Sequence, residues 1–387
     1  MAAISCFKEG PAGDTLPVMF LRALVFLLGL ASLGAAALPR IAVSADGKHF
    51  VEKGSDRVFV PWGFNYDHDS KDRLIEDYWH DEWPAVVGDF EEMKALGANV
   101  VRIHLQLGKV MSTPDQPDPK TLARLARLID LAGEKGLYLD LTGLGCYHAK
   151  DVPAWYDALP EEKRWAVQAR FWKAVAETAK GRPEIFCYDL MNEPIVPGGD
   201  KIETEWLAGE LGGKHFVQRI ALDPAGRKPV EIARDWVRHM SDSIREVDRD
   251  TLLTVGVIPW ATVFPNAKPL FHSPEAGKPL DFVSVHFYPE RGKIDEALKA
   301  LAVYEVGKPL VIEEIFPLKC DLVELENFID RSSATVDGWV GFYWGTPPDQ
   351  LDRKDLSGAI TRGWLEYFQR HAARMKAGGR KMGKPVK

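Results

Sequence analysis

Two acidic positions, each at the end of an apolar run, are the residues of this sequence best suited to chemistry. The segment CYDLMNEPI reads as a buried strand from Cys187 to Met191, followed by Asn192, Glu193 and a proline that stops it. In the segment KPLVIEEIFP, the apolar run 310–312 is followed by Glu313 and Glu314. Two carboxylates in one pocket suit glycosidic cleavage, because one can protonate the departing oxygen while the other attacks the sugar carbon.

Polar and aromatic side chains also follow the other predicted strands. They are Asn65 and Tyr66, Arg102 and His104, Thr142 with Tyr147 and His148 in the loop behind it, Trp260, His286 and Tyr288, and Trp344. Flat indole faces stack against the C–H faces of sugars. The set therefore predicts a ring of carboxylates, one cation, amide and imidazole donors and indoles around a sugar-binding pocket.

The elements that would position this ring alternate between short apolar runs and stretches of helical period. The predicted strands are 58–64, 99–103, 137–141, 185–191, 252–257, 282–285, 310–312 and 339–344, and the predicted helices are 86–96, 121–134, 160–180, 230–247, 294–303, 321–330 and 358–371. Apolar rather than alternating strands are typical of a parallel sheet covered on both sides. Eight such units favour a single (β/α)8 barrel, whose chemistry sits where strands end and loops begin.

Two further features complete the predicted barrel. The segment IAVSADGKHFVEKGSDRVFV predicts an N-terminal β-hairpin that turns at Asp46 and Gly47. The stretch from Pro194 to Val230 is too long for a plain connection and predicts an insertion between the fourth strand and the fourth helix, over one face of the barrel. The first strand-to-helix turn has no G-x-G-x-x-G, which argues against a dinucleotide site.

The ends of the chain carry their own signals. Arg22, the apolar run 23–33 and the small residues 34–37 indicate a signal peptide over residues 1–37, with Met19 as a candidate start. The run is shorter than the roughly 20 residues of a membrane span, so we expect a secreted or periplasmic protein without a stable membrane anchor. The catalytic domain is then 38–375, and 376–387 is a basic, disordered tail.

Composition limits the partners. A net charge of −7 argues against a general nucleic-acid binder. The three cysteines of the mature chain, Cys146, Cys187 and Cys320, are too far apart in sequence for a zinc site, and free thiols are favoured over a disulfide. We expect a monomer that acts on an oligo- or polysaccharide.

The motifs, taken together, resemble glycoside hydrolase family 5, the cellulase family of clan A. The matching pieces are YDLMNEP, VRIH, VHFYP, KPLVIEEIF and YWG, which occur in the order of the family between Val58 and Trp344. The resemblance implies a retaining hydrolase of a β-linked glucan or mannan that needs no metal or organic cofactor. By the resemblance, Glu193 is the general acid/base and Glu314 the nucleophile.

The resemblance also implies roles for the supporting residues. Asn192 would bind the sugar 2-hydroxyl, Arg102 and Tyr288 would contact Glu314, His286 would contact Glu193 or the sugar, and Trp344 would form the floor under the attacked sugar. Asn65, His148 and Trp260 are further candidates, with His148 near the position where many members carry a histidine and this chain has Thr142. Because successive strand residues face opposite sides, Glu313 is expected to point away from Glu314.

Two alternatives remain beside this interpretation. One is a secreted carbohydrate-binding barrel without catalysis, which the presence of both carboxylates argues against. The other is a metal-dependent hydrolase barrel, which the absence of H-x-H and H-E-x-x-H spacing argues against.

Overall fold

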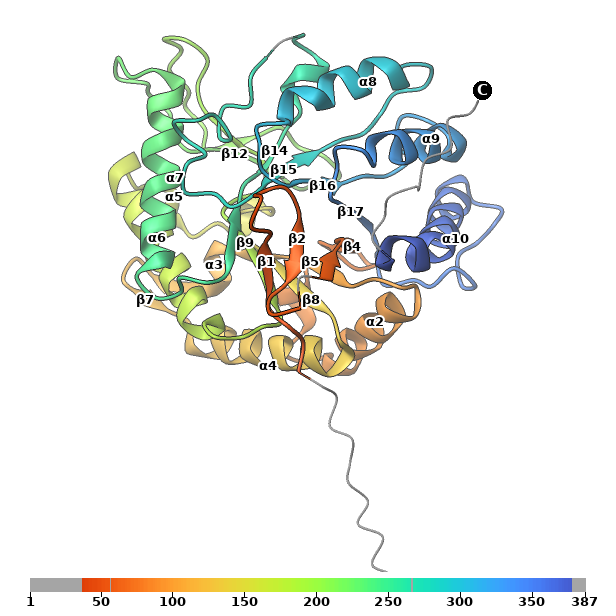
Figure 1. Cartoon of the computed structure of the whole chain (residues 1–387). Helices are drawn as coiled ribbons and strands as arrows, with labels where there is room; N and C mark the ends of the chain where they lie inside the picture. The colour runs from red at the N-terminus through yellow and green to blue at the C-terminus, as the bar shows by residue number, and fades with distance from the viewer. Residues whose placement is uncertain (1–36, 56, 266, 378–387) are drawn as a thin grey trace, which may run out of the picture. The chain divides into compact units, whose positions relative to one another are not determined.

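The computed structural model describes residues 37–377, except residues 56 and 266 (Figure 1). Residues 1–36 of the predicted leader and residues 378–387 of the predicted tail lie outside this part. Within the described residues, no helix combines the length and the hydropathy that crossing a bilayer requires.

Eight parallel strands close into a barrel. They are β4 (Trp62–Tyr66), β5 (Val100–Gln106), β8 (Tyr138–Gly145), β9 (Ile185–Asp189), β13 with β14 (Leu252–Thr254 and Gly256–Val257), β15 (Val283–His286), β16 (Leu310–Glu314) and β17 (Gly338–Phe342). β13 pairs with β9 and β14 pairs with β15, so the two pieces of the fifth strand join the ends of the sheet. β17 pairs with β4, which completes the ring and confirms the predicted (β/α)8 barrel.

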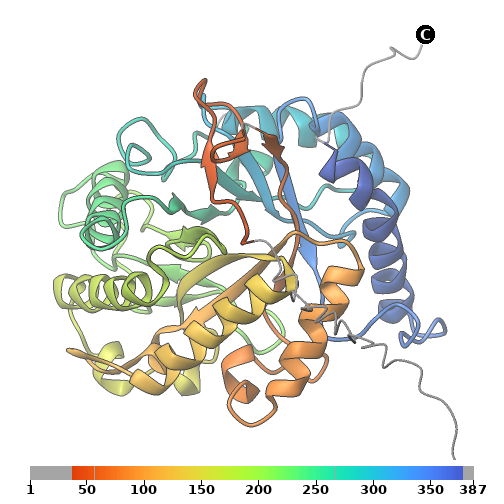
Figure 2. The same cartoon turned by 60° about the horizontal axis from the view of Figure 1, so that its bottom comes forward.

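Helices cover the outer side of the sheet. The longer ones are α2 (Trp83–Ala95), α4 (Pro119–Lys135), α6 (Glu161–Ala179), α7 (Pro229–Arg245), α8 (Ile294–Leu301), α9 (Leu322–Ser332) and α10 (Leu356–Lys376). The first and last of these, α2 in orange and α10 in blue, lie side by side (Figure 2), and Gln369 Nε2 donates to the carbonyl of Ala95. Between β14 and β15 the described residues contain one 3-10 helix, η2 (Trp260–Thr262), and no α-helix.

Local signals explain where a helix such as α4 begins and ends. Asp118 caps it by accepting from the backbone N–H of Thr121 at 2.7 Å, and Pro119 occupies the first helical position. The helix ends at Gly136, whose φ of 64° is the left-handed conformation that glycine adopts without strain. Its apolar face, predicted from the period of residues 121–134, is buried against the barrel at Leu125 and Leu128.

The N-terminal hairpin covers the end of the barrel at which the strands begin. β1 (Ile41–Val43), β2 (Phe50–Glu52) and β3 (Arg57–Phe59) form an antiparallel sheet. The hairpin lies in front of the barrel strands in Figure 1. Phe50 is fully buried and meets the rings of Phe186 and Phe282 edge-on, both at 5.1 Å. The predicted strand 58–64 is divided into β3 and β4, because Pro61 has no N–H for a ladder.

The segment between β9 and α7 forms a small sheet of its own. β12 (Val217–Arg219) pairs in parallel with β10 (Pro194–Ile195) and antiparallel with β11 (Leu207–Ala208). Side chains hold this segment over the barrel: Gln218 Nε2 donates to the carbonyl of Leu144 at 2.9 Å, and the buried Lys214 is ion-paired with Asp72. The segment therefore forms one wall above the strand ends.

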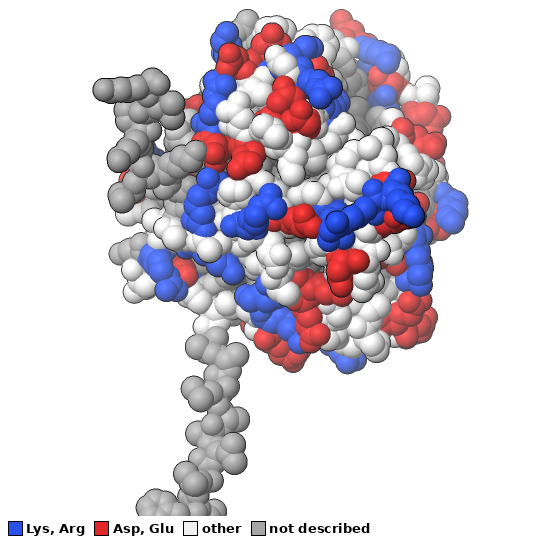
Figure 3. All heavy atoms as spheres, turned by 90° about the vertical axis from the view of Figure 1, so that its right-hand side faces the viewer, with Lys and Arg blue, Asp and Glu red and all other residues white. Residues whose placement is uncertain are grey.

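The remaining elements are short connections near the rim. They are α1 (Ile75–Tyr78), α3 (Leu107–Val110), β6 (Met111–Thr113), β7 (Gln116–Pro117), η1 (Ala149–Asp151), α5 (Ala154–Asp157) and η3 (Ala302–Tyr304). Cys146, Cys187 and Cys320 are all free thiols, as predicted. On the face shown in Figure 3, acidic and basic side chains lie interspersed.

Candidate active site

A cavity of about 720 Å³ opens at the end of the barrel where the strands finish. Its volume is in the usual range for small-ligand sites. Six residues of the predicted ring line it: His104, Asn192, Glu193, Tyr288, Glu314 and Trp344. The active face of a (β/α)8 barrel is this end, so the cavity lies where the strand-end argument predicts it.

Glu193 follows β9 in a conformation that few non-glycine residues adopt. Its φ is 47°, in the left-handed region, and its N–H donates to the carbonyl of Gly256 at 2.9 Å. A residue held there costs of order 1–3 kcal/mol, and such residues cluster at functional sites. The preceding Asn192 is also fixed, since its Oδ1 accepts from Arg102 at 2.9 Å and its Nδ2 donates to the carbonyl of Phe216 at 2.9 Å.

Glu314 stands opposite Glu193 at the end of β16. A carboxylate oxygen of each, together with a ring nitrogen of His286, lies within 4.8 Å of the others. Glu314 Oε1 accepts from Arg102 Nη1 at 2.9 Å and Glu314 Oε2 accepts from Tyr288 Oη at 2.6 Å. These two donors fix the carboxylate on both sides, as the resemblance to the family implies.

Arg102 anchors the site from below, inside the barrel. It is fully buried, and its Nη2 donates to Asp189 Oδ2 at 2.8 Å while its Nη1 donates to Asn65 Oδ1 at 2.8 Å. Burial and the neighbouring charge of Glu313 raise the pKa of Asp189 to about 6. Thr142 at the end of the third barrel strand donates its hydroxyl to Asp189 Oδ2 at 2.9 Å.

His286 contacts both glutamates from the end of β15. Its Nδ1 lies 2.8 Å from Glu193 Oε1 and 3.4 Å from Glu314 Oε1. Burial opposes the charged ring, but Glu314, Glu193 and Glu313 outweigh burial and raise the pKa of His286 to about 10. The ring is therefore an imidazolium at neutral pH and donates a hydrogen bond to Glu193.

The prediction that Glu313 points away from the site is wrong. Glu313 is fully buried inside the barrel, and its Oε2 lies 3.7 Å from both Arg102 Nε and His286 Nε2. The strand alternation fails at this point because the register shifts: Val285 pairs with Ile312, but the next residue, His286, pairs with Glu314. Glu313 is the extra residue, so both glutamates contact the same two cations.

Trp344 follows β17 and forms part of the cavity wall. Its Nε1 donates to Asp67 Oδ1 at 3.1 Å, and its ring is stacked on His68 with centroids 5.6 Å apart and planes at 8°. Burial raises the pKa of Asp67. Asp67 and His68 lie one and two residues beyond Tyr66, the last residue of the first barrel strand, so the strand-end argument that selected Asn65 would also have found them.

Asn65, His148 and Trp260 are predicted residues that neither contact the side chains of Glu193 and Glu314 nor line the cavity. Asn65 is buried beneath it, where its Nδ2 donates to the carbonyls of Glu313 at 2.8 Å and Gly341 at 3.0 Å, so it supports Arg102 rather than facing a ligand. His148 lines a separate, smaller pocket beside Gln106. Trp260 begins η2 and is 43% exposed, outside the cavity lining.

Other lining residues were not found by the sequence argument. The wall above β9 supplies a run from Gly209 to Val217, including Lys214 and Phe216, for which the sequence has neither period nor motif. Phe216 packs on Tyr147 with ring centroids 4.9 Å apart, and Tyr147 Oη lies 2.5 Å from His104 Nδ1. Burial and the nearby guanidinium of Arg102 hold the pKa of His104 well below its usual value, so this histidine is neutral.

Two groups of side chains carry the donor atoms that metal ions use. One is Glu193, His286 and Glu314, and the other is Asp140, Cys187 and Glu313. Glu313 and Glu314 in these groups already lie against the guanidinium of Arg102. Its positive charge disfavours a second cation at the same carboxylates.

Solved structures share this fold at low sequence identity. An exo-β-1,4-mannosidase from Opitutaceae bacterium strain TAV5 matches with a TM-score of 0.60 and 18% identity over 87% of this chain and 62% of that one. A β-1,4-mannanase from the sea hare Aplysia kurodai matches with a TM-score of 0.58 and 16% identity, over 90% of this chain and 100% of that one. The catalytic domain of an endoglucanase from Thermobifida fusca matches with a TM-score of 0.55 and 14% identity, over 87% of this chain and 98% of that one.

Sequence comparison identifies the family. No match to a curated protein was found. The family model for cellulase, glycosyl hydrolase family 5, matches residues 67–315, which is more than half of the chain and spans both Glu193 and Glu314. The chain belongs to glycosyl hydrolase family 5, the cellulase family.

Proposed function

We propose that this protein is a retaining β-glycosidase that cleaves a β-1,4-linked glucan or mannan through Glu193 and Glu314. The observation that carries the proposal is the spacing of the two carboxylates, which have oxygens within 4.8 Å of each other in one cavity. Retaining glycosidases place these groups about 5–5.5 Å apart, whereas inverting enzymes leave about 6.5–9.5 Å for a water molecule.

The proposed reaction has two steps. Glu314 attacks the anomeric carbon while Glu193 gives its proton to the glycosidic oxygen, so the bond to the departing sugar breaks and a glycosyl ester of Glu314 forms. Glu193, now a carboxylate, takes a proton from water, and the oxygen of that water attacks the same carbon. The ester breaks, Glu314 is released as a carboxylate, and the product keeps its original configuration.

The surrounding residues support each step. Arg102 and Tyr288 both donate to Glu314 and hold its carboxylate in place for attack. The imidazolium of His286 stabilises Glu193 after it has lost its proton. The aromatic residues Trp344 and Phe216 supply flat faces along the cavity. No step of this scheme requires a metal ion or an organic cofactor, and a chelator is expected to leave the activity unchanged.

The substrate class rests on the family and on the mannosidase, mannanase and endoglucanase that share the fold. A panel of β-1,4-mannan, β-1,4-glucan and β-1,3-glucan with analysis of product length tests it. Release of single sugars would indicate exo action, and a ladder of oligosaccharides would indicate endo action. Turnover of the β-1,3-glucan alone would contradict the proposed linkage.

Substitution of the two glutamates tests the catalytic assignment. In Glu193→Gln, activity on the polysaccharide should fall about 10²–10⁴-fold, the usual contribution of a general acid. The loss should be smaller for the first turnover of a dinitrophenyl glycoside, whose leaving group needs no proton. Glu314→Gln should abolish turnover of both substrates, because no ester can form. Proton NMR of the wild-type reaction should show the β-anomer as the first product.

The cavity offers a matched control for these variants. Glu210 also lines the cavity but is exposed on the wall above β9. Glu210→Gln changes the same functional group at the same mouth and should keep full turnover. Wild-type activity in Glu193→Gln and Glu314→Gln would refute the assignment, and sugar binding without hydrolysis by the wild type would favour the non-catalytic barrel.

Export through an N-terminal signal peptide is also part of the proposal. It rests on Arg22, the apolar run 23–33 and the small residues before Leu38. N-terminal sequencing of the exported protein is expected to give a chain that begins near Leu38, and an intact leader on the exported chain would contradict it.

A further inference from the structure

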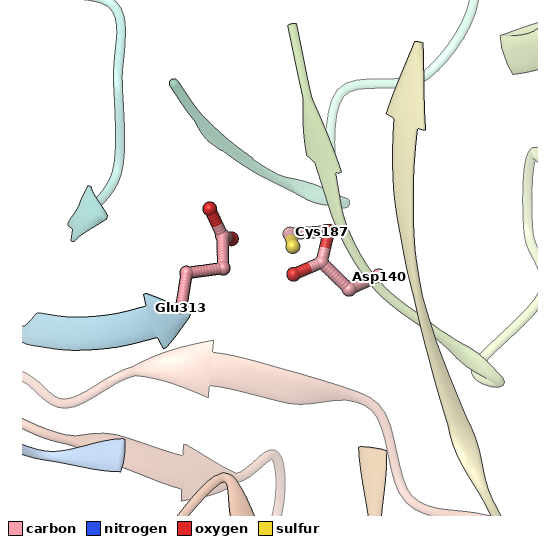
Figure 4. A group of neighbouring side chains, drawn as sticks. All are labelled: Asp140, Cys187 and Glu313. Atoms are coloured by element: carbon pink, nitrogen blue, oxygen red, sulfur yellow. The ribbon is translucent and has the colours of Figure 1, made fainter. Parts of the chain in front are cut away.

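A second layer of ionisable side chains lies inside the barrel, directly beneath the two glutamates of the cavity. Glu313 projects from β16 toward Asp140 of β8 and Cys187 of β9 (Figure 4). One donor atom from each of these three residues lies within 4.8 Å of the others. All three are buried, so whatever charge they carry acts on its neighbours with little screening by solvent.

Four polar atoms of this layer converge without hydrogen bonds. Arg102 Nε, His286 Nε2, Glu313 Oε2 and Asp140 Oδ1 are buried and have no partner at hydrogen-bond distance among the described residues. Glu313 Oε2 lies 3.7 Å from both Arg102 Nε and His286 Nε2. The other oxygen of Glu313 accepts from Ser284 Oγ at 3.0 Å. One carboxylate oxygen of Glu313 is therefore held by a hydrogen bond from Ser284, and the other by ionic contacts with Arg102 and His286.

Retained protons must reduce the negative charge of this cluster, because its carboxyl groups outnumber its cations. Two cations, Arg102 and His286, face five carboxyl groups: Asp140, Asp189, Glu193, Glu313 and Glu314. Burying several unbalanced anions is costly. Burial and the charge of Glu313 raise the pKa of Asp140 well above its usual value. Although burial also acts against ionised Glu313, Arg102 and His286 lower its pKa to about 2. Asp140 therefore holds the proton and Glu313 the charge.

We propose that Glu313 is a positioning residue for the reaction proposed above: its carboxylate, next to protonated Asp140, holds His286 as an imidazolium that points Nδ1–H at Glu193. The geometry fits this role, because the two nitrogens of the ring face two different glutamates, Nε2 toward Glu313 and Nδ1 toward Glu193 Oε1 at 2.8 Å. Glu193 Oε2 is then left to carry the proton for the substrate.

The same trio could instead be interpreted as a metal site. Carboxylate and thiol groups are suitable ligands. However, the guanidinium of Arg102 and the imidazolium of His286 already lie against Glu313 Oε2, so a metal ion at the trio would meet two positive charges. A proton on Asp140 satisfies the cluster at lower electrostatic cost.

The titration of His286 tests the proposal without relying on activity. In protein labelled with ¹⁵N-histidine, the signals of His286 are identified by their absence in His286→Asn. In the wild type both ring nitrogens should stay protonated throughout pH 5–8. In Glu313→Gln the titration midpoint should fall toward the ordinary histidine value of about 6.5, because one of the three glutamates that favour the charged ring is removed while Glu314 and Glu193 remain. The other charged groups that face the ring, Glu193, Glu314 and Arg102, and the neutral His104 are unchanged in this variant.

Asp140→Asn is the matched variant. An asparagine amide donates a hydrogen bond as a protonated carboxyl does, so His286 should stay charged and kcat should remain within about threefold of the wild type. In Glu313→Gln, kcat should fall roughly tenfold or more with little change in KM, the pattern of an interaction that acts in the transition state.

Specific results would overturn the proposal. A neutral His286 in the wild type between pH 5 and 8 would do so even if Glu313→Gln does not fold. Equal titration of His286 in the wild type and in Glu313→Gln would do so as well, as would an equal loss of kcat in Asp140→Asn and Glu313→Gln. Full activity of Glu193→Gln would instead show that the catalytic assignment of Glu193 is wrong, and this result is distinct from those that test Glu313.

Discussion

At the scale of single residues, Gly256 shows how closely the charged layer is packed. It starts β14, at the break in the fifth strand, and its N–H donates to Asp189 Oδ1 at 2.8 Å. A Cβ at this position would lie 2.6 Å from both Glu313 Oε2 and His286 Nε2. No side chain larger than hydrogen fits there without moving one of these two groups.

Gly256→Ala is therefore expected to damage the site and the fold together. Overpacking of this kind costs about 1–3 kcal/mol of stability, and displacement of His286 should reduce kcat more than KM. Urea unfolding and steady-state kinetics measure the two effects. Gly88→Ala is the control, because a Cβ at Gly88 in α2 meets nothing within 4 Å and alanine favours a helix. Unchanged kcat in Gly256→Ala would show that the layer tolerates displacement.

The two glutamates that the sequence placed at strand ends do lie together at the cavity. Glu193 and Glu314 follow apolar runs, and both line the cavity with oxygens within 4.8 Å. The orientation of Glu313 was not predictable, because it depends on a register shift between β15 and β16 that leaves no mark in the composition of either strand. The catalytic roles of Glu193 and Glu314 stay predictions until the activities of the variants are measured.

At the scale of elements, helices with a strong period and clear caps were predicted to within a few residues. The prediction of 121–134 corresponds to α4, and that of 230–247 to α7, which begins at Pro229 and ends at Arg245. The wall above β9 was expected only as an insertion. Its internal pairing, with β12 between β10 and β11, depends on contacts with Leu144 and Asp72 that lie far away in the sequence.

The hairpin at the opposite end of the barrel allows a test of element function. Phe50 is fully buried between Phe186 and Phe282, far along the strands from the cavity. Phe50→Ala should lower the free energy of unfolding by about 3–5 kcal/mol, because it leaves a cavity among these rings. In a (β/α)8 barrel, one end contributes to stability and the opposite end to catalysis. The kcat and KM of the folded fraction should therefore stay within about twofold of the wild type.

Val58 provides the control for Phe50. It lies in β3 of the same hairpin but is 46% exposed, so Val58→Ala should change the free energy of unfolding by less than about 1 kcal/mol. Denaturant unfolding, with kinetics at a temperature where both variants are folded, measures the difference. A fall in kcat of Phe50→Ala without a loss of stability would contradict the separation of the two ends.

At the scale of the whole molecule, the number of strands predicts that the barrel closes. It does not predict that the fifth strand is split into β13 and β14. The eight apolar runs predicted the ring, and the pairing of β17 with β4 closes it. The fifth strand, however, is split at Val255, with β13 bound to β9 and β14 bound to β15. This split brings Gly256 toward Asp189 and Glu313, so the irregular point of the ring lies directly beneath the site.

Buried acids also make the stability of the whole chain depend on pH. Glu76 of α1 is 5% exposed, its Oε2 accepts from the N–H of Gln106 at 2.8 Å, and its Oε1 has no partner among the described residues. Burial raises the pKa of Glu76 to about 8 from an ordinary value of 4.5. Between these values the folded state keeps a proton that the unfolded state has lost, so stability falls as pH rises, by up to about 1.4 kcal/mol per pH unit.

Glu76→Gln should remove this contribution, since glutamine resembles the protonated acid and cannot ionise. The variant should therefore gain stability relative to the wild type as the pH rises from 5 to 8, and the gain should level off above pH 8. Urea unfolding at several pH values measures it. Glu134→Gln, on the exposed side of α4, is the control. Both variants retain Asp140, Asp189 and the other buried acids, so the difference between the two variants excludes the contribution of these acids to the pH dependence of stability. A difference between wild type and Glu76→Gln that is constant across this range would mean that Glu76 is ionised in the folded protein, and the unpaired Oε1 would then need a cation or water to stabilise it.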